Sequence, residues 1–313
     1  MACTYFGEQY LTTRRSEGVT PFCCEVPDAG TNYVLVLSVL GHSNGSRGGY
    51  RASWTQLAGM TVARSMHGCV ALDGKLYAVG GAGATHHALD TAEVYDPQAD
   101  GWQPLAKMST ARYALGLATV GGKIYASGGW DGGNLDSVEA YDPQLGSWAL
   151  VASMGAKRKS HASVVLDGKI YAMGGDGGWG CLISGTVEMY DPQADSWQRV
   201  ASMPRGLAKH TAATMGGKIY VTGGYHQSGS AESVNPVYVY DPQADAWTQL
   251  ASMSVARRLH ASTAVGGKLY VFGGRGAGGE RLSTAEVYDP ASDSWAQVSS
   301  LTSPRDGLVA VAL

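Results

Sequence analysis

The feature that most constrains this chain is a repeat with a period of about fifty residues. Tryptophan recurs in near-constant steps, at Trp54, Trp102, Trp148, Trp197, Trp247 and Trp295. A Gly-Gly pair recurs in the same phase, beginning at Gly80, Gly128, Gly174, Gly223 and Gly273. A Tyr-Asp-Pro triplet does likewise, beginning at Tyr95, Tyr141, Tyr190, Tyr240 and Tyr288. This regularity predicts that the chain consists of stacked copies of one structural unit.

Each unit has the pattern of four β-strands. In the third unit an apolar run at 162–166 is followed by Asp167-Gly168 and then by a second run at 169–173. Asp-Gly between two β-rich runs predicts a two-residue hairpin, because both turn residues take a positive φ. A third strand is expected at 186–190, and Asp-Pro ends it because proline cannot donate to a β-ladder. The fourth strand begins at the tryptophan, and no segment has sustained helical periodicity, so we expect an all-β chain.

The repeat also predicts how the sheets are arranged. A four-stranded sheet cannot bury both of its faces alone, so we expect successive sheets to pack radially as the blades of a propeller. The diglycine, the Tyr-Asp-Pro triplet and the spaced tryptophan together resemble the kelch repeat over residues 54–301. The resemblance implies a kelch β-propeller made of four-stranded antiparallel blades.

The number of blades depends on the two ends of the chain. Five complete units are expected at 61–108, 109–154, 155–203, 204–253 and 254–301. Residues 305–313 match only the first strand of a further unit, while the N-terminal part offers an apolar strand at 33–39 and a last strand at 54–57. We therefore expect six blades, the first of them composite and closed by the C-terminal strand, because closure removes exposed sheet edges. No Gly-Gly directly follows the 33–39 run and no Tyr-Asp-Pro precedes Trp54, so we expect this blade to be the least regular.

The propeller would then occupy residues 31–313. Residues 1–30 show no repeat, and we expect them to form a flexible N-terminal arm or the remnant of an upstream domain. An arm of this length has no room for a BTB or F-box segment, so a role in a ubiquitin ligase would require a fragment or another mode of recruitment.

Composition and charge exclude several functional classes. The formal net charge of −3 argues against nonspecific nucleic-acid binding, which requires many Lys and Arg side chains on phosphates. The longest apolar run, 33–40, is far shorter than the ~20 residues that span a bilayer, so no membrane association is expected. The five cysteines have irregular spacing that fits neither a disulfide framework nor a zinc site, and no signal peptide is present. These features predict a cytoplasmic protein without a cofactor.

The recurring residues are interpreted as scaffold, because a repeat needs the same packing residue in every unit. This interpretation includes the arginines that precede the first strand of most units, at Arg64, Arg112, Arg158, Arg257 and Arg305. Function is expected where the units differ, in loops at one end of a rigid scaffold.

Candidate binding residues follow from the resemblance to the kelch substrate adaptors of cullin ubiquitin ligases. In that family two positions per blade line the ligand pocket, one after the recurrent Arg and one after Gly-Gly. The first position holds Ser65, Tyr113, Lys159, Ala208, Arg258 and Asp306. The second holds Ala82, Trp130, Asp176, Tyr225 and Arg275. The Arg slot of the fourth unit holds Leu207, which makes Ala208 the weakest match. Aromatic and arginine side chains in this set are typical anchors of protein interfaces.

Cationic side chains lead the third, fourth and fifth units, at Lys157, Arg158 and Lys159, at Arg205 and Lys209, and at Arg257, Arg258 and Arg275. Arginine binds carboxylate and phosphate groups in a forked geometry, so an acidic or phosphorylated peptide is one expected ligand. The alternative is an ordinary solvated basic rim, diluted by Asp131, Asp136, Asp176, Glu232 and Asp306.

Four histidines recur at one level of the first strands, at His67, His161, His210 and His260. If their rings faced a common channel they could bind zinc or copper, but a propeller channel is too wide at that level for ligands to converge on one ion. We therefore predict no metal site.

The sequence predicts a protein-binding propeller rather than an enzyme. No phosphate loop, nucleophile elbow or HExxH motif is present. The resemblance implies substrate recognition for a ubiquitin ligase, or the binding of actin or another scaffold. The alternative is a carbohydrate-active enzyme of the oxidase or mutarotase type with its site at the channel mouth, where a carboxylate pair such as Asp176 and Asp306 could act.

Overall fold

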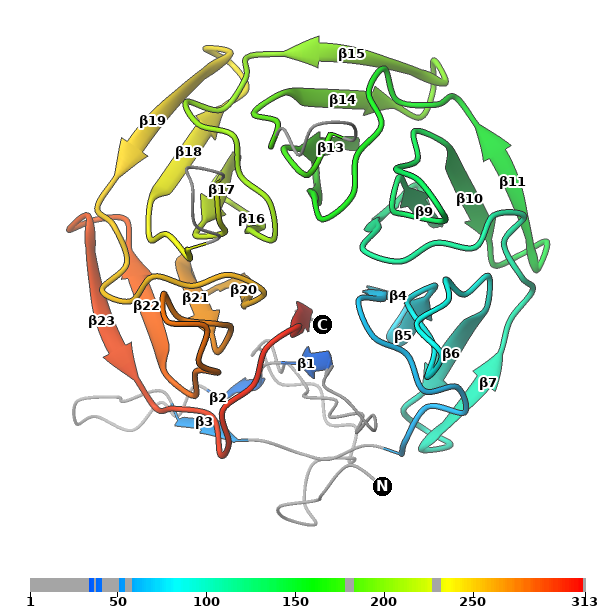
Figure 1. Cartoon of the computed structure of the whole chain (residues 1–313), viewed down its shortest axis with the longest axis horizontal. Coiled ribbons are helices and arrows are strands. Elements are labelled where there is room, and N and C mark those ends of the chain that lie inside the picture. Colours follow the sequence, from blue (N-terminus) through cyan, green and yellow to red (C-terminus); the bar gives the residue numbers. More distant parts are fainter. Residues whose placement is uncertain are drawn as a thin grey trace.

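The structure is a computed structural model in which residues 34–36, 38–40, 51–53, 58–177, 183–226 and 232–311 are described. The predicted N-terminal arm, 1–30, lies outside the described residues. Five four-stranded antiparallel sheets surround a central channel as the blades of a propeller (Figure 1). In the described part of the chain, no helix is long and apolar enough to cross a bilayer.

The strands follow the chain from the centre of each blade to its rim. Blade 1 contains β4 (Gly68–Leu72), β5 (Lys75–Val79), β6 (Ala92–Asp96) and β7 (Gly101–Pro104). Blade 2 contains β8 (Gly116–Val120), β9 (Lys123–Ser127), β10 (Val138–Asp142) and β11 (Ser147–Val151). Blade 3 contains β12 (Ala162–Leu166), β13 (Lys169–Met173), β14 (Val187–Asp191) and β15 (Ser196–Val200). Blade 4 contains β16 (Thr211–Met215), β17 (Lys218–Thr222), β18 (Val237–Asp241) and β19 (Ala246–Leu250). Blade 5 contains β20 (Ala261–Val265), β21 (Lys268–Phe272), β22 (Ala285–Asp289) and β23 (Ser294–Val298).

The prediction of six blades is wrong, because the propeller has five. The chain ends form two separate two-stranded sheets instead of a sixth four-stranded blade. β24 (Val309–Val311) pairs with β1 (Val34–Val36) in parallel, and β2 (Ser38–Leu40) pairs with β3 (Arg51–Ser53) in an antiparallel sheet. Each of these strands has only three residues. The physical reason lies in the sequence: without a diglycine in the phase of the repeat and without a Tyr-Asp-Pro turn, the N-terminal part lacks the signals that shape the second and third strands of a blade.

The C-terminal strand nevertheless lies in the ring. β24 contacts both β20 of blade 5 and β4 of blade 1, so it occupies the gap between the last blade and the first (Figure 1). The C-terminal strand was predicted to close the ring by pairing with the N-terminal part of the chain. It does pair with β1, although the two strands run parallel.

The diglycines let neighbouring blades approach closely. Gly80 and Gly81 have φ of 64° and 101°, which favours glycine. The Arg112 carbonyl of blade 2 accepts a hydrogen bond from Gly81 N at 2.8 Å, and a Cβ on Gly80 would lie 2.5 Å from that oxygen. A side chain here would therefore separate the two blades.

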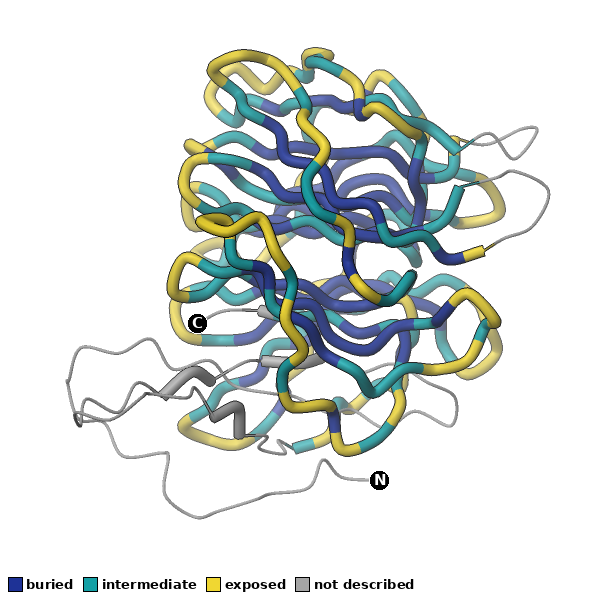
Figure 2. The backbone as a smooth tube through the Cα atoms, turned by 90° about the vertical axis from the view of Figure 1, so that its left-hand side faces the viewer, coloured by how far each residue is buried: buried dark blue, intermediate teal, exposed yellow. Residues whose placement is uncertain are grey.

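Aromatic side chains complete the packing between blades. Each Tyr-Asp-Pro tyrosine is buried against the tryptophan of its own fourth strand, as for Tyr190 and Trp197, whose ring centroids are 5.0 Å apart. The indole N–H of Trp197 donates to the Ala152 carbonyl of the preceding blade at 2.9 Å. The scaffold interpretation of these residues is thus confirmed, and the buried backbone is concentrated in the strands while loops carry the exposed residues (Figure 2).

Candidate functional site

The first strands surround a cavity of about 500 Å³ along the propeller axis. At one end of it lies a ring of residues in the left-handed region, with φ between 51° and 54°, or 70° at the glycine: Met66, Ala114, Ser160, Lys209, Leu259 and Gly307. We call this end the mouth. Backbone hydrogen bonds connect the ring from blade to blade, such as Leu259 N to Lys209 O at 2.9 Å and Lys209 N to Ser160 O at 2.9 Å. The mouth is therefore a rigid collar rather than a set of loose loops.

The residues predicted to bind a ligand lie in pairs around the mouth, one pair on each blade. Five of the six residues of the first series, all but Asp306, face a counterpart of the second series in a short antiparallel bridge: Ser65 with Ala82, Tyr113 with Trp130, Lys159 with Asp176, Ala208 with Tyr225, and Arg258 with Arg275. In blade 5, for example, Arg258 N donates to Arg275 O at 3.0 Å and Arg275 N donates to Arg258 O at 2.8 Å. The structure thus brings the two predicted series together.

These residues surround the mouth but do not line the cavity below it. The residue that follows each member of the first series, from Met66 to Gly307, is the one that lines the cavity. The side chains of Ala82 and Ala208 are buried and offer nothing to a ligand, whereas those of Tyr113, Trp130, Lys159, Tyr225 and Arg258 are partly exposed. The role of this set in binding stays a prediction.

One side of the mouth, on blades 1 to 3, is aromatic and apolar. The rings of Tyr113 and Trp130 lie 5.2 Å apart, and the Lys159 ammonium lies 5.9 Å from the centre of the Trp130 ring. Lys159 also forms an ion pair with Asp176 at 3.7 Å, so its charge has a partner within its own blade. Met66 exposes 42% of its surface on the collar beside these residues. A partner could bury apolar surface here.

The other side, on blade 5 and the C-terminal segment, is cationic. Asp306 is buried and its two carboxylate oxygens accept hydrogen bonds from Nε of Arg275 and, at 2.8 Å, Nε of Arg281. Arg258 donates to the Ser233 hydroxyl at 3.1 Å, and the Ser233 hydroxyl in turn donates to the Arg275 carbonyl. Asp306 therefore orients two guanidinium groups at the mouth, and its own carboxylate is enclosed.

The recurrent arginines take no part in the mouth. Arg64, Arg112, Arg158 and Arg257 are at most 1% exposed, and each forms an ion pair with a glutamate of the third strand, as in Arg112–Glu139 at 2.9 Å. Burial lowers the pKa of each of these arginines, and the hydrogen bond to its glutamate opposes this shift. The prediction that they are structural is confirmed for these four arginines; for Arg305, which is partly exposed, it stays a prediction.

Blade 4 replaces both members of this ion pair. Leu207 stands in the arginine position and Tyr238 in the glutamate position, and both belong to one buried apolar cluster. The two positions thus change together, as expected if a buried charge cannot remain without its partner.

The histidines pack between blades. The Cε1 atoms of His161, His210 and His260 lie 2.8 to 3.0 Å from where a Cβ of Gly128, Gly174 or Gly223 would be, so each ring covers the diglycine of the preceding blade. His161 Nε2 lies 3.2 Å from the Ser127 hydroxyl, and His260 Nε2 lies 2.8 Å from the Thr222 hydroxyl. Burial lowers the pKa of His67 to about 3 and that of His210 to about 4, so these rings are neutral near pH 7.

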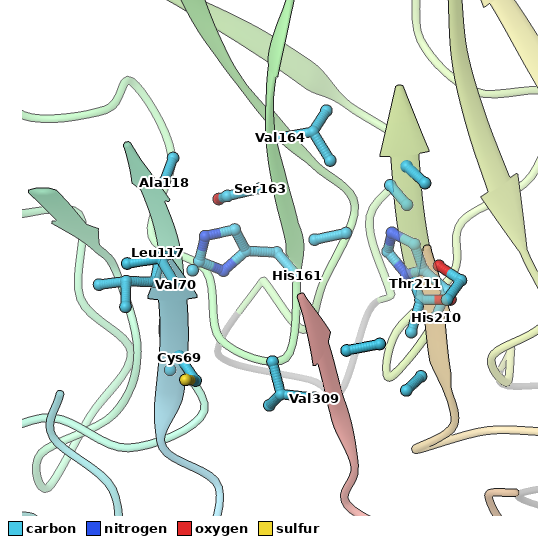
Figure 3. A pocket seen from close by; sticks show the side chains of 18 of the residues that line it. Cys69, Val70, Leu117, Ala118, His161, Ser163, Val164, His210, Thr211 and Val309 are labelled. Atoms are coloured by element: carbon cyan, nitrogen blue, oxygen red, sulfur yellow. The ribbon is translucent and has the colours of Figure 1, made fainter. Parts of the chain in front are cut away.

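The histidines and the other possible ligands do not form a metal centre in the described ranges. Among these residues, no three His, Cys, Asp or Glu side chains are grouped closely enough to hold an ion. Figure 3 shows His161 and His210 in the cavity wall, directly before the first strands of blades 3 and 4 and each beside a hydroxyl side chain, Ser163 or Thr211.

The two predicted series omitted Lys209, Met66 and Arg281, although Lys209 was among the cationic side chains expected to bind an acidic or phosphorylated peptide. Lys209 and Met66 follow the predicted positions by one residue, and their left-handed backbone turns the chain into the cavity. A signal was available for Lys209, since it is a long cationic side chain at a collar position that elsewhere holds a small or apolar residue. Arg281 lies beyond the resemblance, in the variable loop of blade 5, and only the fold brings it to Asp306.

A further unrepeated surface lies on the outer edge of blade 2. Leu145 is 76% exposed and Leu150 is 65% exposed there. The position of Leu150 holds Arg199, Gln249 and Gln297 in the next three blades, so this edge is less polar than its counterparts.

Comparisons with known proteins agree with the propeller fold. The KLHDC2/KLHL20/DRC7 Kelch-repeats domain matches residues 158–313, and the Kelch motif matches residues 63–109 and 111–155. An F-box/kelch-repeat protein of Arabidopsis thaliana is 46% identical over 46 residues, which make up 15% of this chain and only 12% of that relative. A solved structure, described as the structure of YjhT, superposes with a TM-score of 0.71 at 18% identity and covers 82% of this chain and 89% of its own. Similarity at this level of identity shows the fold alone.

Proposed function

This chain belongs to the kelch-repeat β-propeller family, and we propose that it is a protein-binding propeller that holds a segment of its partner at the mouth. Kelch domains generally bind proteins. The fold alone does not choose a function, so the proposal depends on the side chains of the mouth.

One observation carries the proposal: the side chains stop repeating at the mouth. The interior uses the same Tyr–Trp contact in every blade, whereas the bridge positions hold Tyr113 with Trp130 in blade 2 and Arg258 with Arg275 in blade 5. These side chains are partly exposed and stand on a hydrogen-bonded collar, so little entropy would be lost in ordering them on binding. Aromatic and arginine residues on a rigid support are typical of interface hot spots.

The biological setting we propose is substrate recognition for a ubiquitin ligase, with attachment to actin or another scaffold as the other form of protein binding. The similarity to an F-box/kelch-repeat protein supports the ligase setting, although it extends over only 46 residues. Co-purification of ligase subunits with the protein from cells would support this setting, and co-purification of cytoskeletal proteins alone would favour the scaffold.

The cavity is the feature that would serve a carbohydrate-active enzyme, which is the second candidate. Its volume of about 500 Å³ could hold a monosaccharide, and its wall carries imidazole and hydroxyl groups such as His260, Thr211 and Ser163. However, Asp306 is enclosed by two arginines and Asp176 by Lys159, so the carboxylates named from the sequence are engaged in ion pairs. Conversion of a free sugar by the purified protein would decide for this candidate.

The test is capture of partners from a cell lysate with variants of the mouth and a matched control. Arg258→Glu and Trp130→Ala alter the cationic and aromatic sides, and Arg199→Glu makes the same charge change on the exposed outer strand of blade 3. We expect partners that the wild type and Arg199→Glu retain and both mouth variants lose. If all variants with wild-type thermal stability retain the same partners, the mouth is not the binding surface, and Leu150→Gln then tests the outer edge of blade 2.

A further inference from the structure

The outer edge of blade 2, which consists of β11 and the turn before it at 145–146, lacks a polar contact that the other four blades share. In those blades the residue directly before the fourth strand is an aspartate. In blade 3, Asp195 Oδ1 accepts one hydrogen bond from the Tyr190 hydroxyl at 2.7 Å and another from the Ala152 N–H at 2.8 Å. The same pair of hydrogen bonds is made in the other three blades by Asp100, Asp245 and Asp293. Each aspartate therefore joins the third strand of its blade to the linker that enters the blade.

Gly146 takes this position in blade 2 and has no carboxylate to offer the two corresponding donors. These donors are the Tyr141 hydroxyl and the Ala106 N–H, and neither donates to another residue in the described part of the chain. Tyr141 is only 4% exposed. Ala106 is exposed, whereas its counterparts in the other linkers are partly buried: Ala58, Ala152, Ala201 and Ala251. A Cβ on Gly146 would meet no atom within 4 Å, so the two donors lie beside a space that is open to solvent.

The other blades show which chemical group this pair of donors favours. In blade 3 the hydrogen bonds from Ala152 and from Tyr190 lower the pKa of Asp195, and the corresponding bonds lower the pKa of the aspartates in blades 4 and 5. The pair of donors therefore stabilises an ionised carboxylate. Asp142, the acidic residue next to Tyr141 in the chain, is itself paired with Lys123 at 3.1 Å, which reduces its repulsion of a second carboxylate.

Apolar side chains flank the same space. Leu145 is 76% exposed and Leu150 is 65% exposed, and they are two of the three large apolar side chains that are exposed in the described ranges. Trp148 lies opposite Tyr141 in the β10–β11 pair, and Leu150, two residues further along β11, is on the same face of the sheet. The counterparts of Leu150 in the other blades are Pro104, Arg199, Gln249 and Gln297. Proline and charged residues protect exposed strand edges from pairing, and the edge of blade 2 has no such residue at this position.

We infer that the outer edge of blade 2 is a second docking surface, which takes an extended protein segment with an aspartate or glutamate between apolar residues. The carboxylate of this segment accepts the hydrogen bonds of Tyr141 and Ala106 in place of the missing aspartate, and the apolar side chains cover Leu145 and Leu150. The donors are held in position, because the Tyr141 ring is buried and the Trp148 indole donates to the Ala106 carbonyl at 2.9 Å. The surface belongs to the outermost strand of its blade and not to the mouth, so the inference does not depend on the proposed function (Figure 1).

The test is a selection from a phage library of random peptides. The library is first depleted on Gly146→Asp, in which the chain itself supplies the carboxylate, and is then selected on the wild type. Aspartate has φ of 44–45° at this position in the other four blades, so Gly146→Asp should melt no lower than the wild type. We expect the selected peptides to contain Asp or Glu next to apolar residues. A selection that yields no acidic peptide, or peptides that bind Gly146→Asp as tightly as the wild type, would overturn the inference.

The affinity of one selected peptide, measured by isothermal titration calorimetry, tests each part of the surface. Replacing its acidic residue by the amide should weaken binding by roughly tenfold, since a hydrogen bond to a charged group contributes that order of affinity. Tyr141→Phe removes one donor and Leu150→Gln copies blades 4 and 5, so both should also weaken binding. The matched control is Tyr190→Phe, whose hydroxyl already binds an aspartate of the chain and which should leave the affinity unchanged.

Arg258→Glu separates this surface from the mouth. Peptide binding that survives Arg258→Glu and is weakened by Tyr141→Phe supports the outer edge of blade 2, even where capture experiments refute binding at the mouth. Peptide binding that is lost in Arg258→Glu and kept in Tyr141→Phe would show that the peptide binds at the mouth, and it would refute the docking surface on blade 2.

Discussion

Two consecutive arginines in blade 5 belong to different regions of the molecule. Arg257 is completely buried and its guanidinium donates to the Gly273 and Thr284 carbonyls and to Glu286. Arg258 is partly exposed at the mouth, where it donates to the Ser233 hydroxyl. An arginine thus stabilises the fold at position 257 and is a candidate binding residue at position 258.

The difference teaches how a repeat separates stability from function. The environment of Arg257 recurs in four blades, and blade 4 abandons it only by replacing both partners, with Leu207 and Tyr238. The position of Arg258 holds a different residue in every unit, and its neighbours differ too. We therefore expect changes in the buried region to act on folding and changes at the mouth to act on binding.

The largest effect is expected from Arg257→Leu. The substitution leaves the Glu286 carboxylate buried without its cation, which costs about 3–5 kcal/mol of the free energy of unfolding. Chemical denaturation measures the loss. The control is the double variant Arg257→Leu, Glu286→Tyr, which copies blade 4 and should recover much of that stability; a double variant no more stable than the single one would contradict the pairwise account.

The next effect concerns acid stability. The pKa of His210 falls from 6.5 in the unfolded chain to about 4 in the fold, so unfolding takes up a proton between these values. Its contribution to stability is complete above about pH 6.5 and is lost as the pH falls toward 4, at up to about 1.4 kcal/mol per pH unit. His67 adds a similar loss that continues to about pH 3.

His210→Leu tests this account, because Leu115 already fills the same position in blade 2. Its free energy of unfolding, measured from pH 7 to pH 4, should fall less steeply than that of the wild type. An identical slope in the two proteins would show that His210 does not stay neutral in the fold.

A smaller effect on stability is expected at the aromatic side of the mouth. Trp130→Ala removes the contact with Tyr113 and the face under Lys159, which together contribute about 1 kcal/mol. The corresponding interior change, Trp197→Ala, also removes the hydrogen bond to Ala152 and contacts between blades, so its melting temperature should fall further. Equal losses in the two variants would remove the distinction between mouth and interior.

The smallest effect on stability is expected from Arg258→Gln. The side chain is partly exposed, and surface substitutions of this kind change the free energy of unfolding by at most about 0.5 kcal/mol. Thermal denaturation of Arg258→Gln and of Arg257→Gln compares the stability losses at the two neighbouring positions. A loss at position 258 as large as that at 257 would show that both arginines are structural.

Local features of the fold could be predicted from the sequence. The strands expected at 162–166 and 169–173 match β12 and β13, and Asp167 and Gly168 have φ of 49° and 71° as a two-residue hairpin requires. The third strand of that unit is β14, one residue later than expected. These features succeed because hairpin chemistry and alternation act over a few neighbouring residues.

Features that depend on distant residues were harder to predict. The prediction of a sixth blade failed because pairing of the chain ends needs more than one apolar run at each end, and the strands described at the two ends have only three residues each. At the mouth, the positions followed from the motif, but the ion pair of Arg281 with Asp306 joins a variable loop to the C-terminal segment. Such contacts are set by the closure of the ring and leave no pattern in the local sequence.

The most direct test of the central claim is the affinity of a captured partner for Arg258→Glu and for Arg199→Glu, measured with both proteins at wild-type thermal stability. The account predicts that Arg258→Glu binds at least tenfold more weakly than the wild type, as for an interface hot spot, while Arg199→Glu binds as the wild type does. Equal affinities for the two variants would contradict the claim that the mouth of this propeller is its binding site.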